Sequence, residues 1–275
     1  MHLHTTYSDG ILSPLNIVKF TRLTNHDVIS VTDHDTMEGL EEVEHWAERF
    51  EIEMIPGVEI STYHAGREYH VLGYYLDWKD AELASLFNEM HLQRENRIRL
   101  ILSKLVENYG IRIEFSDLRN FFKTNNYGRP HIALLLMKNG IVGSVREAFD
   151  KYLGDDGPCS AEKLQFATSE AVELIRRKGG LSVLAHPGIY FAHTDTEFKD
   201  ILALGFDGIE VFHPMNDAGM TAALSEYAET RHLIVTGGSD YHGYLNEDIF
   251  SVNIDLKDRD LALMRSRSSR DPASR

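Results

Sequence analysis

The chain is poor in the residues that mark secreted or membrane proteins. Cys159 is the single cysteine among 275 residues, so the chain cannot form an internal disulfide. No segment approaches the roughly 18–20 consecutive apolar residues of a membrane-spanning helix. The first residues turn polar at once, unlike a secretory signal. These absences predict a cytoplasmic protein that has no membrane partner.

Basic side chains are also scarce. The 28 Lys and Arg residues are outnumbered by 43 Asp and Glu residues, which gives a formal net charge of −15. This balance argues against a broad basic face that holds long nucleic acid. A small phosphorylated ligand stays compatible with it, because bound metal ions would reverse the local field.

Strand-like and helical segments alternate in the first 76 residues and again after about residue 166. We expect strands over 28–32, 54–60, 69–76, 181–184, 208–212 and 233–235. Helical patterns lie between them, over 14–23, 37–50, 169–178 and 218–230. Alternation of this kind predicts an α/β fold of parallel strands with helices outside.

The middle of the chain is helical in pattern. Residues 81–109 form one long helical stretch, and 116–122, 130–138 and 144–152 form shorter ones. No strand is expected between 78 and 160. We therefore predict a discontinuous α/β domain over 1–77 and 166–260 and a helical insertion domain over 78–165. The remaining residues, 261–275, are rich in Ser, Arg and Asp and are expected to be a disordered tail.

Histidine and carboxylate side chains recur where the predicted strands end. His2 and His4 are two residues apart, so both imidazoles would leave the same face of a strand. The other candidates are Asp9, His34, Glu59, His70, His186, Asp240 and His242. Strand ends converge on one face of a parallel barrel. Nine donors exceed the needs of one tetrahedral zinc ion and fit two or three divalent ions, bridged by a carboxylate such as Glu59.

Each motif alone has a simpler interpretation. Thr32-Asp33-His34-Asp35 could be a capped turn, and Ala185-His186-Pro187-Gly188 could be a loop that ends a strand. Five segments that place such side chains at strand ends favour metal, because these groups would otherwise lack compensation. His213 follows a strand and is expected in the wall of the site. Glu210 is expected to point inward without binding metal.

Taken together, the motifs resemble those of the PHP (polymerase and histidinol phosphatase) family in order and spacing. They are His2-x-His4, Ser8-Asp9-Gly10, Thr32-Asp33-His34-Asp35, Gly57-Val58-Glu59, His70-Val71-Leu72-Gly73, Ala185-His186-Pro187 and Ser239-Asp240-x-His242. The resemblance implies a distorted (β/α)7 TIM-like PHP barrel with an inserted helical domain. It also implies up to three ions, with manganese favoured over iron or zinc. One ion would be held by His2, His4, Glu59 and Asp240, a second by Glu59, His70 and His186, and a third by Asp9, His34 and His242.

The segment Gly128-Arg129-Pro130-His131-Ile132-Ala133 is similar to one subgroup, the TrpH/YciV-type phosphoesterases. That similarity implies hydrolysis of the 3′-phosphate of nucleoside 3′,5′-bisphosphates, and of short 5′-phosphorylated RNA, by a metal-bridging hydroxide. We expect catalytic roles for His131, Arg129 and Asp33, and substrate contacts from Arg129, His131 and His213. Water or His131 would protonate the leaving hydroxyl. The alternatives are a histidinol-phosphate phosphatase and a non-catalytic metal-binding accessory module.

Overall fold

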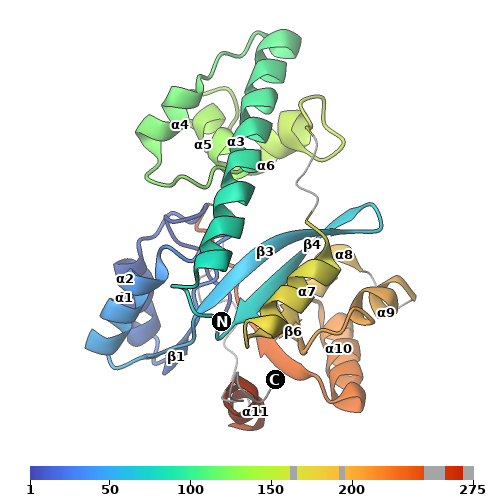
Figure 1. Ribbon diagram of the computed structural model, residues 1–275. Coiled ribbons are helices and arrows are strands. Elements are labelled where there is room, and N and C mark those ends of the chain that lie inside the picture. Colours follow the sequence, from blue (N-terminus) through green and yellow to red (C-terminus); the bar gives the residue numbers. More distant parts are fainter. Residues whose placement is uncertain (162–165, 192–195, 245–257, 269–275) are drawn as a thin grey trace.

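The strands of the protein form two sheets. The computed structural model describes residues 1–161, 166–191, 196–244 and 258–268 (Figure 1). Strands β1 (Val28–Ile29) and β2 (Glu53–Met54) pair in parallel as a small sheet. The larger sheet has five strands in the order β3 (Gly57–His64), β4 (Arg67–Tyr74), β5 (Leu181–Leu184), β6 (Gly208–Phe212) and β7 (Ile234–Gly237).

The expectation of parallel strands is only half right. Strands β5, β6 and β7 are parallel, but β4 runs antiparallel to both β3 and β5. The reason lies in the connection between β3 and β4, where Ala65 and Gly66 have φ values of 47° and 88°. A two-residue turn with two positive φ angles joins antiparallel neighbours, because parallel strands need a long crossover.

No closed barrel forms by continuous strand pairing in the described part of the chain. Single bridges instead continue the five-stranded sheet at both edges, Leu3 with Tyr241 beyond β7 and His34 with Glu59 on β3. The amide of Thr32 donates to the carbonyl of Leu3 at 2.9 Å. The segments around residues 3 and 34 therefore lie between the two edge strands.

Helices cover the sheets from outside. They are α1 (Pro14–Leu23), α2 (Leu40–Arg49), α7 (Thr168–Arg177), α8 (Pro187–Tyr190), α9 (Thr196–Leu202) and α10 (Ala218–Arg231). Pro14 opens α1 as expected, and Asp217 caps α10 by accepting from the Met220 amide at 2.8 Å. Their buried faces contribute Ile17, Val43, Ile175 and Leu224 to the main hydrophobic core. Among the described residues, no helix has the length and apolar character needed to cross a membrane.

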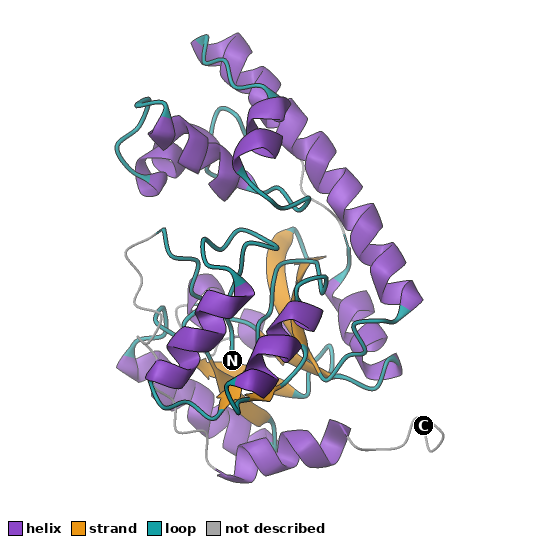
Figure 2. Ribbon diagram, turned by 90° about the vertical axis from the view of Figure 1, so that its left-hand side faces the viewer, coloured by secondary structure: helices purple, strands orange, loops and turns teal. Residues whose placement is uncertain are grey.

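The regular secondary structure in the described middle of the chain is all helical, as predicted. It contains α3 (Ala81–Tyr109), α4 (Phe115–Phe121), α5 (Arg129–Lys138), α6 (Val145–Ala148) and the π-helix η1 (Phe149–Leu153). Figure 1 shows α4, α5 and α6 beside the upper part of α3, and Figure 2 shows the long α3 running along one side of the molecule. Leu83 and Phe87 of α3 belong to the main core, whereas Ile101 and Leu105 belong to a second core. The domain boundaries at 78 and 165 stay a prediction.

The predicted disordered tail is wrong over its first residues. Helix α11 (Asp258–Ser268) begins before residue 261 and includes the first eight residues of that tail. Met264 is fully buried in a third hydrophobic cluster with Ile55, Tyr74 and Ile234. The segment is rich in Arg and Ser, so its composition did not predict the apolar contact made by Met264. Residues 269–275 lie outside the described residues.

Candidate metal centre

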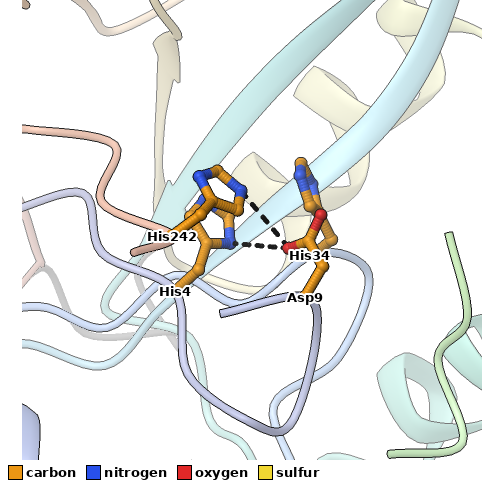
Figure 3. A group of neighbouring side chains, drawn as sticks. All are labelled: His4, Asp9, His34 and His242. Atoms are coloured by element: carbon orange, nitrogen blue, oxygen red, sulfur yellow. Dashed lines mark ion pairs between the residues drawn. The ribbon is translucent and has the colours of Figure 1, made fainter. Parts of the chain in front are cut away.

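All nine side chains predicted as ligands come together at one rim of the sheets. Their donor atoms form three overlapping groups, each within 4.8 Å: His4, Asp9, His34 and His242; His2, His4, Glu59 and Asp240; and His34, Glu59 and His70. His186 joins the third group because its Nε2 lies 2.8 Å from Oε1 of Glu59. Figure 3 shows the first group, in which Asp9 Oδ1 lies 3.3 Å from His242 Nε2 and 3.8 Å from His4 Nδ1.

Glu59 lies at the centre of this cluster and is fully buried. Its Oε1 is 2.8 Å from Nδ1 of His70 and 2.8 Å from Nε2 of His186. Its Oε2 faces the other way, 3.2 Å from His2, 3.1 Å from His4 and 3.1 Å from His34. The two oxygens of one carboxylate thus address two separate sets of imidazoles, which is the arrangement that a bridging ligand requires.

The three carboxylates of the cluster are ionised at neutral pH. Burial disfavours the charge on Glu59, but the imidazoles of His34 and His2 outweigh it and hold the pKa of this carboxyl well below its usual range. Burial likewise opposes the charges of Asp9 and Asp240, whose pKa values nearby histidines lower well below normal.

The histidines carry the compensating positive charge unevenly. Burial opposes protonation of His4, but hydrogen bonds to Asp240 and Glu59 prevail and raise its pKa to about 10. Burial dominates at His34 and lowers the pKa of that imidazole well below its usual value. The protonated imidazole of His4 therefore places a positive charge beside the carboxylates of the cluster.

The residues fit a group of divalent ions. Asp9 Oδ1 and His34 Nδ1 are buried and make no hydrogen bond of regular geometry in the described structure. A buried unpaired polar atom costs about 1–3 kcal/mol, so these atoms favour a bound cation. Imidazole and carboxylate donors suit manganese, iron and zinc alike.

Three residues at the same rim have a strained backbone. His186, Asp240 and Asp35 have φ values of 30°, 52° and 48°, a left-handed region that non-glycine residues rarely adopt. Such strain persists only where surrounding contacts hold it. Here the His186 amide donates to Glu210 Oε2 at 2.8 Å, and Asp240 donates its amide to the His2 carbonyl at 3.0 Å.

Asp33, predicted to be catalytic, lies outside the ligand groups. Its carboxylate accepts from the Thr5 amide at 2.7 Å, from the Thr5 hydroxyl at 2.6 Å and from the Ser8 hydroxyl at 2.5 Å. These contacts hold the turn that leads to Asp9. The structure therefore favours a supporting role for Asp33 over the catalytic one.

His131, predicted as a proton donor and substrate contact, has both ring nitrogens occupied. Its Nδ1 accepts from the Gly128 amide at 2.9 Å, so Nε2 carries the proton and donates to the Ser8 carbonyl at 3.1 Å. The side chain is buried, and burial lowers the pKa of this imidazole. His131 thus joins α5 to the turn before Asp9, an arrangement that does not favour the expected roles.

His213, expected in the wall of the site, lies behind Asp240. Its Nδ1 accepts from the Met215 amide at 3.1 Å, which leaves the proton on Nε2. That nitrogen is 3.6 Å from Asp240 Oδ2, and the side chain is only 2% exposed. His213 is therefore placed to orient Asp240, whereas a direct substrate contact is not favoured.

A cavity of about 150 Å³ connects the cluster with the helical region. Asp9, His34 and His70 line it from the sheet side. From the helices it is lined by Arg94, Arg97, Tyr127, Arg129 and Phe149. Arg129, expected to contact substrate, is one of these lining residues, and its substrate and catalytic roles stay predictions. Arg94 and Arg97 were not predicted from the sequence. Their three-residue spacing on a predicted helix was the available signal, because it places two cations on one helix face.

The three arginines differ in their partners. Arg94 donates to Asp35 Oδ2 at 2.8 Å and to the Ser61 hydroxyl at 2.7 Å. Arg129 donates to the Leu153 carbonyl at 2.9 Å and to Asp155 Oδ1 at 2.6 Å. Arg97 Nε is buried and has no hydrogen-bond partner in the described structure. Burial and the neighbouring Arg129 lower the pKa of Arg97 to about 10, so the side chain remains a cation at neutral pH.

A buried cluster of these donors that opens into an arginine-lined cavity is the arrangement of a metal-dependent phosphoesterase. The sequence profile of the PHP domain matches residues 1–183. The chain therefore belongs to the PHP family, and its α/β fold is the PHP fold.

Characterised relatives and a solved structure agree with this assignment. The chain is 33% identical to a 5′-3′ exoribonuclease of Haemophilus influenzae, with 94% of both chains covered. It is 30% identical to a 3′,5′-nucleoside bisphosphate phosphatase of Chromobacterium violaceum, over 88% of this chain and 86% of that protein. A crystal structure from Bifidobacterium adolescentis, assigned as a metal-dependent phosphoesterase, superposes with a TM-score of 0.87 at 26% identity and covers 100% of this chain and 97% of that one.

Proposed function

We propose that the protein removes the 3′-phosphate of nucleoside 3′,5′-bisphosphates and also acts on short 5′-phosphorylated RNA. The observation that carries this proposal is the cavity that joins the histidine–carboxylate cluster to Arg97 and Arg129. A bisphosphate needs two anion sites, and the cavity has candidates for both. The activities named for the two relatives support the same substrate class.

The proposed ligand sets follow the three groups of the cluster. His2, His4, Glu59 and Asp240 would hold one ion. Glu59, His70 and His186 would hold a second, and Asp9, His34 and His242 a third. Manganese is the leading candidate, with iron or zinc as alternatives. When bound, such ions supply Lewis-acid polarisation of phosphate oxygens and lower the pKa of coordinated water.

The chain's own side chains would orient the substrate. Arg129 and Arg97 are proposed to bind the second phosphate, because a guanidinium can donate two charge-assisted hydrogen bonds to one anion. Arg94 is tied to Asp35 and Ser61 and would mainly shape the cavity. Since two backbone groups occupy His131, we propose water as the source of the proton for the leaving hydroxyl.

We further propose that residues 78–165 are a helical insertion that covers a distorted seven-stranded barrel. The bridges at Leu3 and His34 support the barrel, because they add strand-like segments at both edges of the five-stranded sheet. Hydrogen bonds between the helical region and the rim of the sheets support the insertion as a cover. The side chain of Asn126 donates to the His34 carbonyl, and the hydroxyl of Thr124 donates to the Tyr7 carbonyl at 2.8 Å.

A substrate comparison tests the proposal. The metal-loaded protein should hydrolyse a 3′,5′-bisphosphate with a higher kcat/KM than histidinol phosphate. It should also hydrolyse short 5′-phosphorylated RNA. A preference for histidinol phosphate would instead identify the protein as a histidinol-phosphate phosphatase. Stoichiometric metal binding without hydrolysis of any of the three would favour the accessory-module alternative.

A further inference from the structure

Glu210 is a buried carboxylate that belongs to none of the proposed ligand sets. It lies on β6, at an irregularity of the pairing with β7 between Glu210 and Phe212, and is fully buried. Its Oε1 is 3.1 Å from Nδ1 of His2, and its Oε2 accepts the backbone amide of His186 at 2.8 Å. One side chain thus contacts two proposed ligands that serve two different ions.

The proton positions follow from these partners. The amide of His186 can only donate, so Oε2 of Glu210 must accept. A hydrogen bond between a carboxylate and Nδ1 of His2 likewise requires the proton on Nδ1. Nε2 of His2 is then the nitrogen left to bind an ion, and it lies 3.2 Å from Glu59 Oε2 and 3.2 Å from Asp240 Oδ1. This is the side of the ring that faces the cluster.

We propose that Glu210 is a positioning residue of the metal centre. It fixes His2 in the tautomer whose Nε2 can bind an ion, and it anchors the strained backbone of His186. Partners of this kind orient metal-binding histidines and strengthen their basicity. The inference rests on the metal role proposed above. It assigns a function to Glu210, which we expected from the sequence to point inward without binding metal.

The substitution Glu210→Gln tests the two-acceptor requirement at nearly constant shape. An amide offers one acceptor oxygen and one donor group, so an oxygen that keeps the bond from the His186 amide leaves the NH2 group at the position of Oε1, 3.1 Å from Nδ1 of His2 and facing its proton. Either His2 must move its proton to Nε2, where the proton competes with an ion, or the His186 amide loses its acceptor. Both outcomes weaken metal binding, whereas the overall packing volume is unchanged.

Metal-stripped wild type, Glu210→Gln and Glu226→Gln are titrated with Zn²⁺ against a chelator of known affinity. Glu226 is exposed on α10 and controls for the charge change. Glu210→Gln should bind about ten- to a hundred-fold more weakly, the range typical of lost outer-shell partners, and Glu226→Gln should match wild type. Equal affinities in all three would overturn the inference while leaving the proposed function in place. Absence of binding by wild type would overturn both.

A second measurement does not depend on the variant's folding. In zinc-loaded wild type labelled with ¹⁵N-histidine, the His2 ring is assigned by the signal lost in His2→Gln. Its spectrum should show a proton on Nδ1 and the shift of a metal-bound nitrogen at Nε2. The reverse assignment would overturn the inference, whatever the behaviour of Glu210→Gln.

Discussion

Oε1 of Glu59 and Nε2 of His186 lie 2.8 Å apart, although 127 positions of the chain separate the two residues. The same oxygen contacts His70, and the other oxygen of Glu59 faces His2, His4 and His34. Asp240 also has a histidine near each oxygen, but its Oδ2 faces only His213, at 3.6 Å. Glu59 is therefore the residue whose change should disturb the most ligands at once.

Glu59→Gln should lose bound metal and abolish turnover while the fold survives. The amide keeps the shape of the side chain but removes the negative charge and one acceptor oxygen, so it cannot bridge two ions. Metal content by elemental analysis and kcat on a bisphosphate measure the effect. Glu41→Gln, an exposed substitution on α2, should keep the metal content and the kcat of the wild type. Near-normal kcat in Glu59→Gln would refute the bridging role.

Arg129→Ala and Arg97→Ala should each lower kcat/KM on a 3′,5′-bisphosphate and leave the metal content unchanged. Loss of a hydrogen bond to a charged group costs about 1.5–3 kcal/mol, which corresponds to a roughly ten- to hundred-fold decrease. The decrease should be much smaller on a nucleoside 3′-monophosphate, which lacks the second phosphate. Arg99→Ala, on the exposed side of α3, is the matched control. Equal losses on both substrates would contradict a second-phosphate site.

His131→Ala should lower the free energy of unfolding but should leave the dependence of kcat on pH unchanged. The change leaves the Gly128 amide and the Ser8 carbonyl without their partner, and each buried unpaired group costs about 1–3 kcal/mol. Chemical denaturation measures that loss. The alkaline limb of kcat against pH should stay where it is in wild type. Disappearance of that limb would restore His131 as the general acid.

The metal-stripped protein should lose stability as the pH rises from about 7 to 9. The folded pKa of His4 is raised to about 10 from an ordinary 6.5, so the stabilisation is fully present below pH 6.5 and is lost as the pH rises toward 10. The lowered pKa of His34 acts only below its ordinary value and does not offset this trend. The melting temperature across this range is the measurement.

Metal should reverse the trend, because ions bind deprotonated imidazoles and gain affinity as protons leave. The difference in melting temperature between the metal-loaded and metal-stripped protein should therefore widen from pH 7 to 9. A stripped protein whose melting temperature rises over this range would contradict the charge assignment of the cluster.

The sequence predicted the clustering of the nine candidate side chains better than the architecture that presents them. Imidazoles and carboxylates at strand ends are visible in residue order, and all nine meet as expected. The antiparallel β4 depended on backbone angles at Ala65 and Gly66, which pattern alone does not show. The places of Asp33 and His131 depended on contacts with Ser8, a residue distant from both in sequence.

The proposed ligands come from distant parts of the chain, with His2 and His4 beside Asp240 and His242. During synthesis, the first two histidines leave the ribosome more than two hundred residues before their partners. The nascent polypeptide therefore cannot complete the centre until the strand leading to Asp240 has been made and has docked. Such sequence-distant closure slows folding, and the proposed centre would acquire its ions only after that strand has docked.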